Sequence, residues 1–232
     1  MTKESPYFSG SKPSYTNSAT YFTAPAAVVS LQREQKKNTR VTKTLCSQYC
    51  GKKKRRNKRA GYYAHHPDGT ARAGPTIIVK TTLKHFVLAP YITNKIQSTI
   101  IKIATMPRII TIAAIYSPSR HEISSEEYED FLLHLGPHFI VAGDWNAKHR
   151  AWGSRLITPI GRNLLHVTQH YSLNYLSTGE PTYRPADLNK IPDLLNFAIT
   201  NGISGIYSTI ESSLDLESDH SPIKITLSTS PI

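Results

Sequence analysis

Short runs of β-branched and other apolar residues, each bounded by turn residues, recur along the chain. The clearest runs lie at 76–80, 85–90, 98–105, 109–116 and 139–143. Such runs are typical of strands, and the close succession of the first four favours antiparallel pairing. Later runs in LNYLS, LLNFAIT, GIYSTI and SPIKITL predict further strands.

Two segments between these runs change to helical periodicity. Ser124 and Glu127 have the spacing of a capping box. Apolar residues then follow at helical spacing, namely Tyr128, Phe131, Leu132 and Leu135. The segment GRNLLHVTQHY predicts a second helix. Strands in succession with helices between them indicate an α/β (α+β) fold in which helices pack outside the sheets.

The positive charge of the chain is confined to its first quarter. The net charge is +12, and residues 1–60 hold 14 Lys and Arg against 2 acidic residues. The densest part is GKKKRRNKR at 51–59. We therefore expect residues 1–60 to be a basic, mostly disordered extension and residues 61–232 to be the folded domain. The basic run suits the phosphates of DNA or RNA or a nuclear import receptor, and the alternative is a solvated linker without a partner.

Other sequence features limit the class of protein. Cys46 and Cys50 are too few for a disulfide framework, and their spacing is a poor match to a zinc site. No apolar stretch approaches the ~20 residues of a membrane span. We expect an intracellular monomer, nuclear or cytoplasmic, without membrane contact.

Polar residues follow several of the predicted strands. Asp144 and Asn146 come after the run at 139–143 and, two positions apart in an extended backbone, would point to the same side. The alternative is an Asx turn that caps the strand. Tyr116 ends another strand, and Asp219 and His220 precede the last one. A base for water, donors for phosphate oxygens and an oxygen-rich metal site are what hydrolysis of a phosphodiester requires.

Seven segments, in order between about Tyr62 and Leu227, resemble one family. They are HHPDGTARAGPTIIVK, AIYSPSR, GDWNAKHRAWGSRL, TPIGRNLL, EPTYRP, PDLLNFAIT and SDHSPI. They resemble the endonuclease/exonuclease/phosphatase superfamily, specifically the endonuclease domain of jockey-type non-long-terminal-repeat retrotransposons. The resemblance implies a four-layer sandwich with two packed sheets and a Mg²⁺- or Mn²⁺-dependent site that nicks DNA for target-primed reverse transcription.

The resemblance also implies a role for each site residue. Asp144 would orient and help deprotonate the attacking water, and Asn146 would position water and phosphate. Tyr116 would steady the scissile phosphate. Asp219 would lie on the metal side of the site, and His220 would donate a hydrogen bond to the phosphate.

The chain departs from the family pattern in two places. Residues 1–60 contain no match to the first two family motifs, which supply an Asn and the main metal-binding Glu, so we expect the sandwich to be incomplete at its N-terminal strands. Glu34, after the run VVSLQ, is the nearest candidate for that Glu. Asn196 occupies the position of an Asp that orients the active-site His. Asp193, at an odd offset from it, would face the opposite side of the sheet.

Two functions remain open. The first is a metal-dependent DNA endonuclease that is impaired by these departures. The second is a truncated, catalytically inactive protein whose basic segment binds nucleic acid without sequence specificity.

Overall fold

The computed structural model describes the folded part of the chain and several strands before it. The described residues are 17–18, 20–22, 28–33, 62–65, 75–81, 83–104, 108–203, 208–212, 219–221 and 223–227. Cys46, Cys50 and the basic run 51–59 lie outside these ranges, as does Glu34. The expectations for these residues therefore stay predictions.

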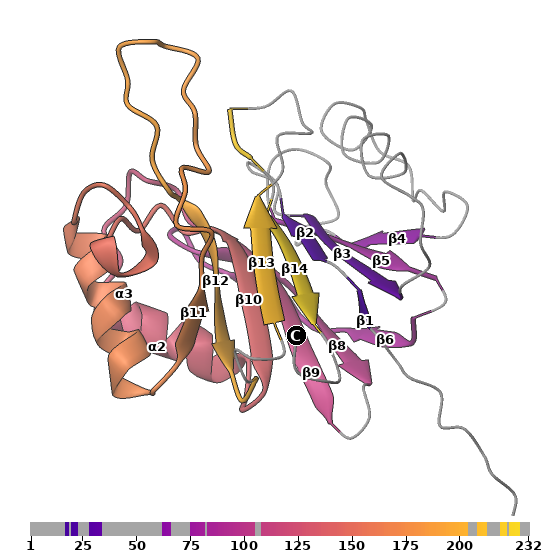
Figure 1. The fold of residues 1–232 in the computed structure, drawn as a ribbon. Coiled ribbons are helices and arrows are strands. Elements are labelled where there is room, and N and C mark those ends of the chain that lie inside the picture. Colours follow the sequence, from indigo (N-terminus) through magenta and orange to yellow (C-terminus); the bar gives the residue numbers. More distant parts are fainter. Residues whose placement is uncertain are drawn as a thin grey trace, which may run out of the picture.

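A mixed sheet forms the centre of the domain (Figure 1). Its hydrogen-bonded order is β11-β12-β10-β9-β8-β6, and β7 also pairs with β8. The strands are β6 (His85–Val87), β7 (Tyr91–Ile92), β8 (Gln97–Ala104), β9 (Ile109–Tyr116), β10 (Phe139–Asp144), β11 (Asn174–Leu176) and β12 (Asn196–Asn201). β9 and β10 are parallel, and the other neighbours are antiparallel. The expected antiparallel succession is confirmed for β6, β8 and β9.

Two helices cover one face of this sheet, on the left of Figure 1. They are α2 (Ser125–His134) and α3 (Pro159–His170), and a short 3₁₀ helix, η1 (Arg150–Trp152), precedes α3. The predicted capping box is confirmed, because Glu127 N donates to Ser124 Oγ and Ser124 N donates to the Glu127 carboxylate. No helix in the described ranges is long and apolar enough to cross a bilayer.

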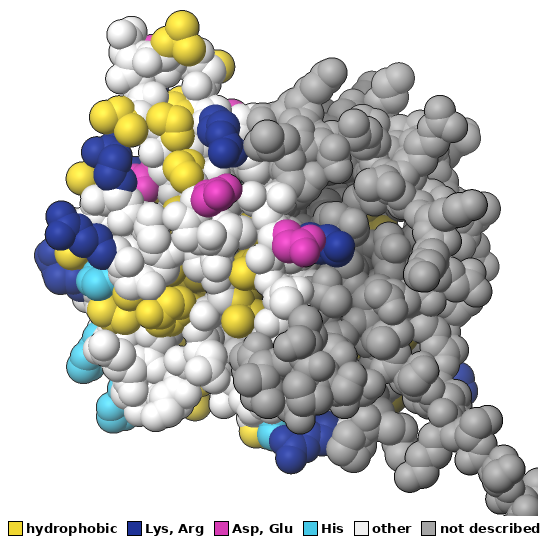
Figure 2. All heavy atoms as spheres, viewed as in Figure 1, with side chains coloured by type: hydrophobic (Ala, Val, Ile, Leu, Met, Phe, Trp, Pro, Cys, Tyr) yellow, Lys and Arg dark blue, Asp and Glu magenta, His cyan; other side chains and the backbone are white. Residues whose placement is uncertain are grey.

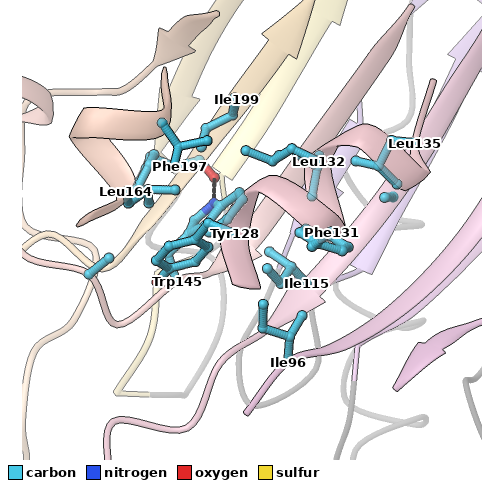
Figure 3. Packing of buried hydrophobic residues seen from close by; sticks show 14 of the residues in the cluster. Ile96, Ile115, Tyr128, Phe131, Leu132, Leu135, Trp145, Leu164, Phe197 and Ile199 are labelled. Carbon is cyan, nitrogen blue, oxygen red and sulfur yellow. Dashed lines mark hydrogen bonds between the residues drawn. The ribbon is translucent and has the colours of Figure 1, made fainter. Parts of the chain in front are cut away.

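The alternation of side chains along each strand builds two cores. On the helix side, Trp145 and Phe197 stack with ring centroids 5.6 Å apart, and Trp145 Nε1 donates to the Phe197 carbonyl (Figure 3). Trp152 stacks on Phe197 at 4.8 Å. These aromatic contacts fix the chain that follows β10 against the start of β12.

The opposite face of the large sheet packs against a second layer of strands. This layer contains β4 (Tyr62–His65) and β5 (Thr76–Lys80), followed later in the chain by β13 (Ser208–Ser212) and β14 (Ile223–Leu227). Buried residues from both layers share one core, with Ile77 and Ile223 packing with Ile112 and Ile140. The run at 76–80 thus forms a strand as predicted, but β5 belongs to this layer and does not pair with β6.

The first quarter of the chain contributes backbone to the second layer. β1 (Asn17–Ser18) and β3 (Val28–Arg33) belong to the sheet ordered β1-β3-β5-β4, and β2 (Thr20–Phe22) pairs with β14. Part of the stretch expected to be an extension therefore lies in strands, and the division at residue 60 stays a prediction. The expected two-sheet sandwich is confirmed. The described residues form three of its four expected layers.

Candidate active site

Three predicted site residues lie side by side at one edge of the large sheet. Asp144, the last residue of β10, is the register partner of Tyr116 on β9 and of Asn196 on β12. Residues in register on neighbouring strands project to the same face. The ends of β9 and β10 and the start of β12 therefore present a phenol, a carboxyl group and an amide in one row.

This row faces the second strand layer. Residues at even offsets along the same strands point to the same face as the row. They are Ile112 on β9, Ile140 on β10 and Ala198 on β12, and all three belong to the core between the layers. Trp145 and Phe197, the next residues along their strands, point to the helix side. Strand alternation thus places the row at the end of the gap between the two layers, where β14 begins.

Asp144 is a buried carboxyl group with a perturbed acidity. Its exposed fraction is 4%. The pKa of Asp144 is raised to about 7. Burial is the largest cause, and the charge of Asp219 acts in the same direction, whereas hydrogen bonds from Asn146 lower the pKa. A carboxyl group with a pKa near neutrality can both accept and release a proton at physiological pH, as a general base requires.

Asn146 forms the turn that was the alternative interpretation of this segment. Its φ is +47°, in the left-handed region that Asn tolerates better than most residues, so the premise of an extended backbone from Asp144 to Asn146 is wrong. Its N–H donates to Asp144 Oδ1 over 3.2 Å, and its Nδ2 donates to the Ser117 carbonyl over 2.9 Å. The Asx turn holds the Asn146 amide beside the Asp144 carboxyl group and ties it to the end of β9.

A short segment, Thr182–Arg184, joins the start of β12 to the residues before β14. Thr182 Oγ1 accepts hydrogen bonds from Leu195 N and Asn196 N at 3.0 and 2.8 Å. On its other side, Arg184 N donates to the Asp219 carbonyl, and Ser221 N donates to the Thr182 carbonyl. These bonds bring Asp219 and His220 to the same edge as the row on the large sheet.

His220 lies half-buried against Tyr183. The two residues form a β-bridge, and their ring centroids are 4.8 Å apart. Burial lowers the pKa of the His220 imidazole, and the adjacent Asp219 charge acts in the opposite direction. The neutral imidazole is therefore favoured near pH 7, and one of its nitrogens then carries a hydrogen to donate.

Tyr116 keeps its proton at neutral pH. Burial, and then the Asp144 charge, raise the pKa of its phenol, while Arg120 acts in the opposite direction. The O–H of Tyr116 is thus a hydrogen-bond donor next to Asp144.

Asn196 contacts the backbone beside His220. Its Nδ2 donates to the Ser221 carbonyl over 3.2 Å, and the side chain is 99% buried. Its Oδ1 is buried and accepts no hydrogen bond from the described residues. An Asn at this position therefore holds the His220–Ser221 backbone through its amide and adds no charge.

Asp193 is occupied by a different set of contacts. Its carboxylate accepts from Arg155 N and Leu194 N at 2.8 and 3.0 Å and pairs with Lys148 Nζ at 3.0 Å. Burial opposes ionisation, but these donors hold the pKa of Asp193 below its usual value. Asp193 thus links the loop after β10 to the start of β12, and it does not replace the missing charge at Asn196.

Thr182, Asp193 and Lys148 were not predicted as site residues. Thr182 stands in EPTYRP and Asp193 in PDLLNFAIT, two of the quoted family segments, but nothing in the local pattern gives them partners. The bonds from Thr182 to the start of β12 and the ion pair of Asp193 with Lys148 join residues 13 to 45 positions apart in the chain. The sequence carries no signal for such contacts without the fold.

A long loop rises above this edge of the sheet. It connects β11 to β12 and projects at the top of Figure 1, and Figure 2 shows hydrophobic side chains gathered on it. Leu188 and Ile191 are exposed there, with exposed fractions of 98% and 60%. Because Thr182–Arg184 belongs to the same loop, the loop begins at the site and extends outward from it.

The charge of Asp219 acts on the buried Asp144 carboxyl group and raises its pKa. Within the described ranges no group of three or more His, Cys, Asp or Glu side chains could hold a metal ion. Magnesium commonly binds through one or two carboxylates together with substrate phosphates and water. Asp219 provides one carboxylate for this smaller set of ligands.

Comparison with known proteins adds to this geometry. Residues 110–224 match the family model described as endonuclease-reverse transcriptase. The chain is 37% identical over 167 residues to a probable RNA-directed DNA polymerase from transposon X-element of Drosophila melanogaster, covering 72% of this chain and 18% of the relative. It is 35% identical over 171 residues to the RNA-directed DNA polymerase from mobile element jockey of the same species, covering 74% of this chain and 19% of the relative.

A solved structure agrees in fold. The endonuclease domain of TRAS1, a telomere-specific non-LTR retrotransposon, superposes with a TM-score of 0.61 at 22% identity, covering 73% of this chain and 81% of that domain. The chain spans less than a fifth of the length of the two Drosophila relatives.

Proposed function

Because the chain belongs to the endonuclease/exonuclease/phosphatase superfamily, as an endonuclease domain of the jockey-like retrotransposon lineage, we propose that it is a metal-dependent DNA nickase with reduced turnover. Its substrate in this proposal is a DNA phosphodiester bond, and the nick provides the primer end for reverse transcription. The observation that carries the proposal is the row of Tyr116, Asp144 and Asn196, which faces the residues before β14.

Asp144 is the group that takes the proton from water. Its raised pKa favours proton uptake, and the Asn146 amide beside it holds the carboxyl group in one orientation. Water attacks phosphorus faster when a base within hydrogen-bond reach removes its proton, and such a base contributes about 10²–10⁴-fold in rate.

Tyr116 and His220 act on the phosphate. Both are neutral hydrogen-bond donors at pH 7, and their pKa shifts favour those states. Donors fixed in advance on a phosphate oxygen stabilise the charge that develops there as the bond breaks, at about 10²–10³-fold each. Thr182 and Asn196 position His220 by holding the backbone on either side of it.

Asp219 would hold the Mg²⁺ or Mn²⁺ ion that the family uses, so that Asp144 stays available as the base. The ion would supply positive charge that neutralises the phosphate oxygens. One carboxylate is a small ligand set, so we expect affinity for Mg²⁺ to be low in the absence of DNA.

Asn196 contributes to the reduced turnover, and the small set of metal ligands contributes more. A carboxylate behind a catalytic imidazole stabilises its protonated form and selects its tautomer, and replacing it by an amide in a serine protease costs about 10⁴-fold. In this chain the Asn196 amide contacts the Ser221 carbonyl and supplies no such charge. We therefore expect slow nicking.

Nicking of supercoiled plasmid by the full chain in Mg²⁺ or Mn²⁺ tests this function. We expect slow conversion to open circles that EDTA stops, and losses of about 10²-fold for Tyr116→Phe and for His220→Gln. Tyr175→Phe, on β11 with its ring partly exposed, is the matched control and should nick at the wild-type rate. Plasmid that stays supercoiled in both metals would support the second candidate, an inactive domain whose basic residues 51–59 bind nucleic acid.

A further inference from the structure

Two histidines, one from each strand layer, contact each other. They belong to β4 and β6, which lie on the right of Figure 1. His65 ends β4, the outermost strand of its sheet, and His85 begins β6, the outermost strand of the large sheet. Their Nε2 atoms are 2.9 Å apart, and their ring centroids are 5.0 Å apart. This pair lies in different strands from the residues of the proposed nuclease site.

The hydrogen bonding of His85 leaves its Nε2 facing His65. His85 Nδ1 lies 2.9 Å from the Leu83 carbonyl oxygen. A carbonyl oxygen only accepts, so Nδ1 carries the hydrogen, and the lone pair of a neutral His85 is then on Nε2. Histidines that bind metals in proteins are oriented in the same way, with the other ring nitrogen donating to a carbonyl or carboxylate.

The separation of the two Nε2 atoms matches that of two nitrogen ligands on one ion. Imidazole nitrogens bind at about 2.0–2.1 Å, so two of them lie about 2.9 Å apart when the angle at the ion is near 90°, and about 3.3 Å apart at a tetrahedral angle. A 90° angle is typical of tetragonal Cu²⁺ and Ni²⁺ sites, which take imidazole readily. Mg²⁺ prefers oxygen ligands and does not fit.

We propose that His65 and His85 form a two-imidazole site for a divalent transition metal of the Cu²⁺ or Ni²⁺ type. Water completes the coordination of the ion. Tyr63 packs against both rings, with centroid distances of 6.4 Å to His65 and 5.7 Å to His85, and limits their reorientation. Because the ligands come from the outer strands of two sheets, the bound ion joins the layers of the sandwich.

Titration of the tag-free chain with Cu²⁺, followed by electron paramagnetic resonance, tests the proposal. We expect one tight equivalent of Cu²⁺ with hyperfine splitting from two imidazole nitrogens. His85→Gln and His65→Gln should each remove that spectrum and weaken Cu²⁺ binding about tenfold or more. Excess Mg²⁺ should leave the spectrum unchanged, which separates this site from the proposed nuclease site.

The matched control uses the other pair of histidines whose rings contact each other among the described residues. His166 and His170 lie one turn apart on α3, with stacked rings whose centroids are 6.4 Å apart. The double variant His166→Gln and His170→Gln should keep the two-nitrogen spectrum.

A second measurement uses thermal unfolding. Circular dichroism first checks that His65→Gln and His85→Gln are folded. Ni²⁺ should then raise the unfolding midpoint of wild type but not that of either of these variants. Loss of the signal in the α3 control alone, or equal Cu²⁺ affinity in wild type and His85→Gln, would overturn the proposal and leave a simple imidazole–imidazole hydrogen bond.

Discussion

Asp144 shows the conflict between stability and activity at a single residue. The folded chain favours the protonated carboxyl group, because the site is buried and Asp219 is close. The preference of the folded chain for protonated Asp144 therefore contributes fully to stability below about pH 4, and this contribution is lost as the pH rises to about 7. Above that pH, folding requires a buried charge.

Asp144→Asn should stabilise the protein at pH 8. Each unit of pKa corresponds to about 1.4 kcal/mol, so removing a shift from 3.8 to about 7 should raise the free energy of unfolding by up to about 4 kcal/mol. Urea denaturation at several values of pH measures this, and the gain should grow between pH 4 and pH 7 and then level off.

Asp193→Asn is the opposite case and serves as the control. Its pKa is lowered despite burial, because Arg155 N and Lys148 donate to the carboxylate. The charge of Asp193 therefore stabilises the fold above about pH 4, and the Asn variant should lose about 3 kcal/mol at pH 8. If both Asn variants shift stability in the same direction, the burial and contacts described for these two carboxyl groups are wrong.

Asn196→Asp tests whether position 196 acts through its amide or through the charge that a carboxylate would add. The new carboxylate cannot donate to the Ser221 carbonyl, and it stands in register with Asp144. We expect a less stable protein at pH 8 and little gain in nicking, because a second buried negative charge raises the pKa of Asp144 further. A large increase in plasmid nicking with Mg²⁺ would show that orientation of His220 is the main defect.

The sequence predicted that Tyr116 and Asp144 end strands, because each closes an apolar run. The structure has each at the end of its strand, in register with the other. Their roles in catalysis stay predictions. The turn at Asn146 was predicted only as the alternative to an extended backbone. The bond from its side chain to the Ser117 carbonyl, 29 residues earlier, has no signal in the local sequence.

At the level of elements, the position of α3 depends on one close contact. A Cβ at Gly161 would lie 1.9 Å from the Lys148 carbonyl oxygen, and Lys148 N donates to Thr158 Oγ1, the N-cap of the helix. The first turn of α3 therefore packs directly on the loop that carries Lys148 to Asp193.

Gly161→Ala should destabilise the protein, although Ala usually favours a helix by about 1 kcal/mol. The methyl group must displace the Lys148 backbone, and we expect a loss of at least about 2 kcal/mol, comparable to overpacking of a core. Thermal unfolding measures the change. Gln169→Ala, exposed at the other end of α3, should be neutral; a neutral Gly161→Ala would show that the helix does not approach Lys148 this closely.

Local sequence signals predicted the elements better than their pairing. The capping box of α2 and the bounds of β9 and β10 follow from residues within one turn or one strand. The placement of β5 in the second layer depends on partners 12 to 48 residues away, in β4 and β3, which the pattern of β5 alone does not specify.

At the level of the whole molecule, charge is distributed unevenly. Residues 1–60 carry the entire net charge of +12. A chain that neutralises several phosphates releases counterions, so its affinity for DNA falls steeply with salt.

Deletion of residues 51–59 should abolish most nonspecific DNA binding. We expect the full chain to lose about 10³-fold or more in affinity between 50 and 200 mM salt, and the deletion variant to show weak binding with a small salt dependence. Fluorescence anisotropy with duplexes of unrelated sequence measures both. Equal affinity of the two proteins would place the binding surface in the folded domain.

If Asp144 is the base of a DNA-nicking site, removing its charge should stop nicking without unfolding the protein. Wild type and Asp144→Asn are incubated with supercoiled plasmid at pH 8 in Mg²⁺, under conditions where urea denaturation shows both to be folded. We expect slow nicking by wild type and a loss of about 10²-fold or more in the variant, although the variant is the more stable protein. Equal nicking by the two proteins would show that Asp144 is not the base.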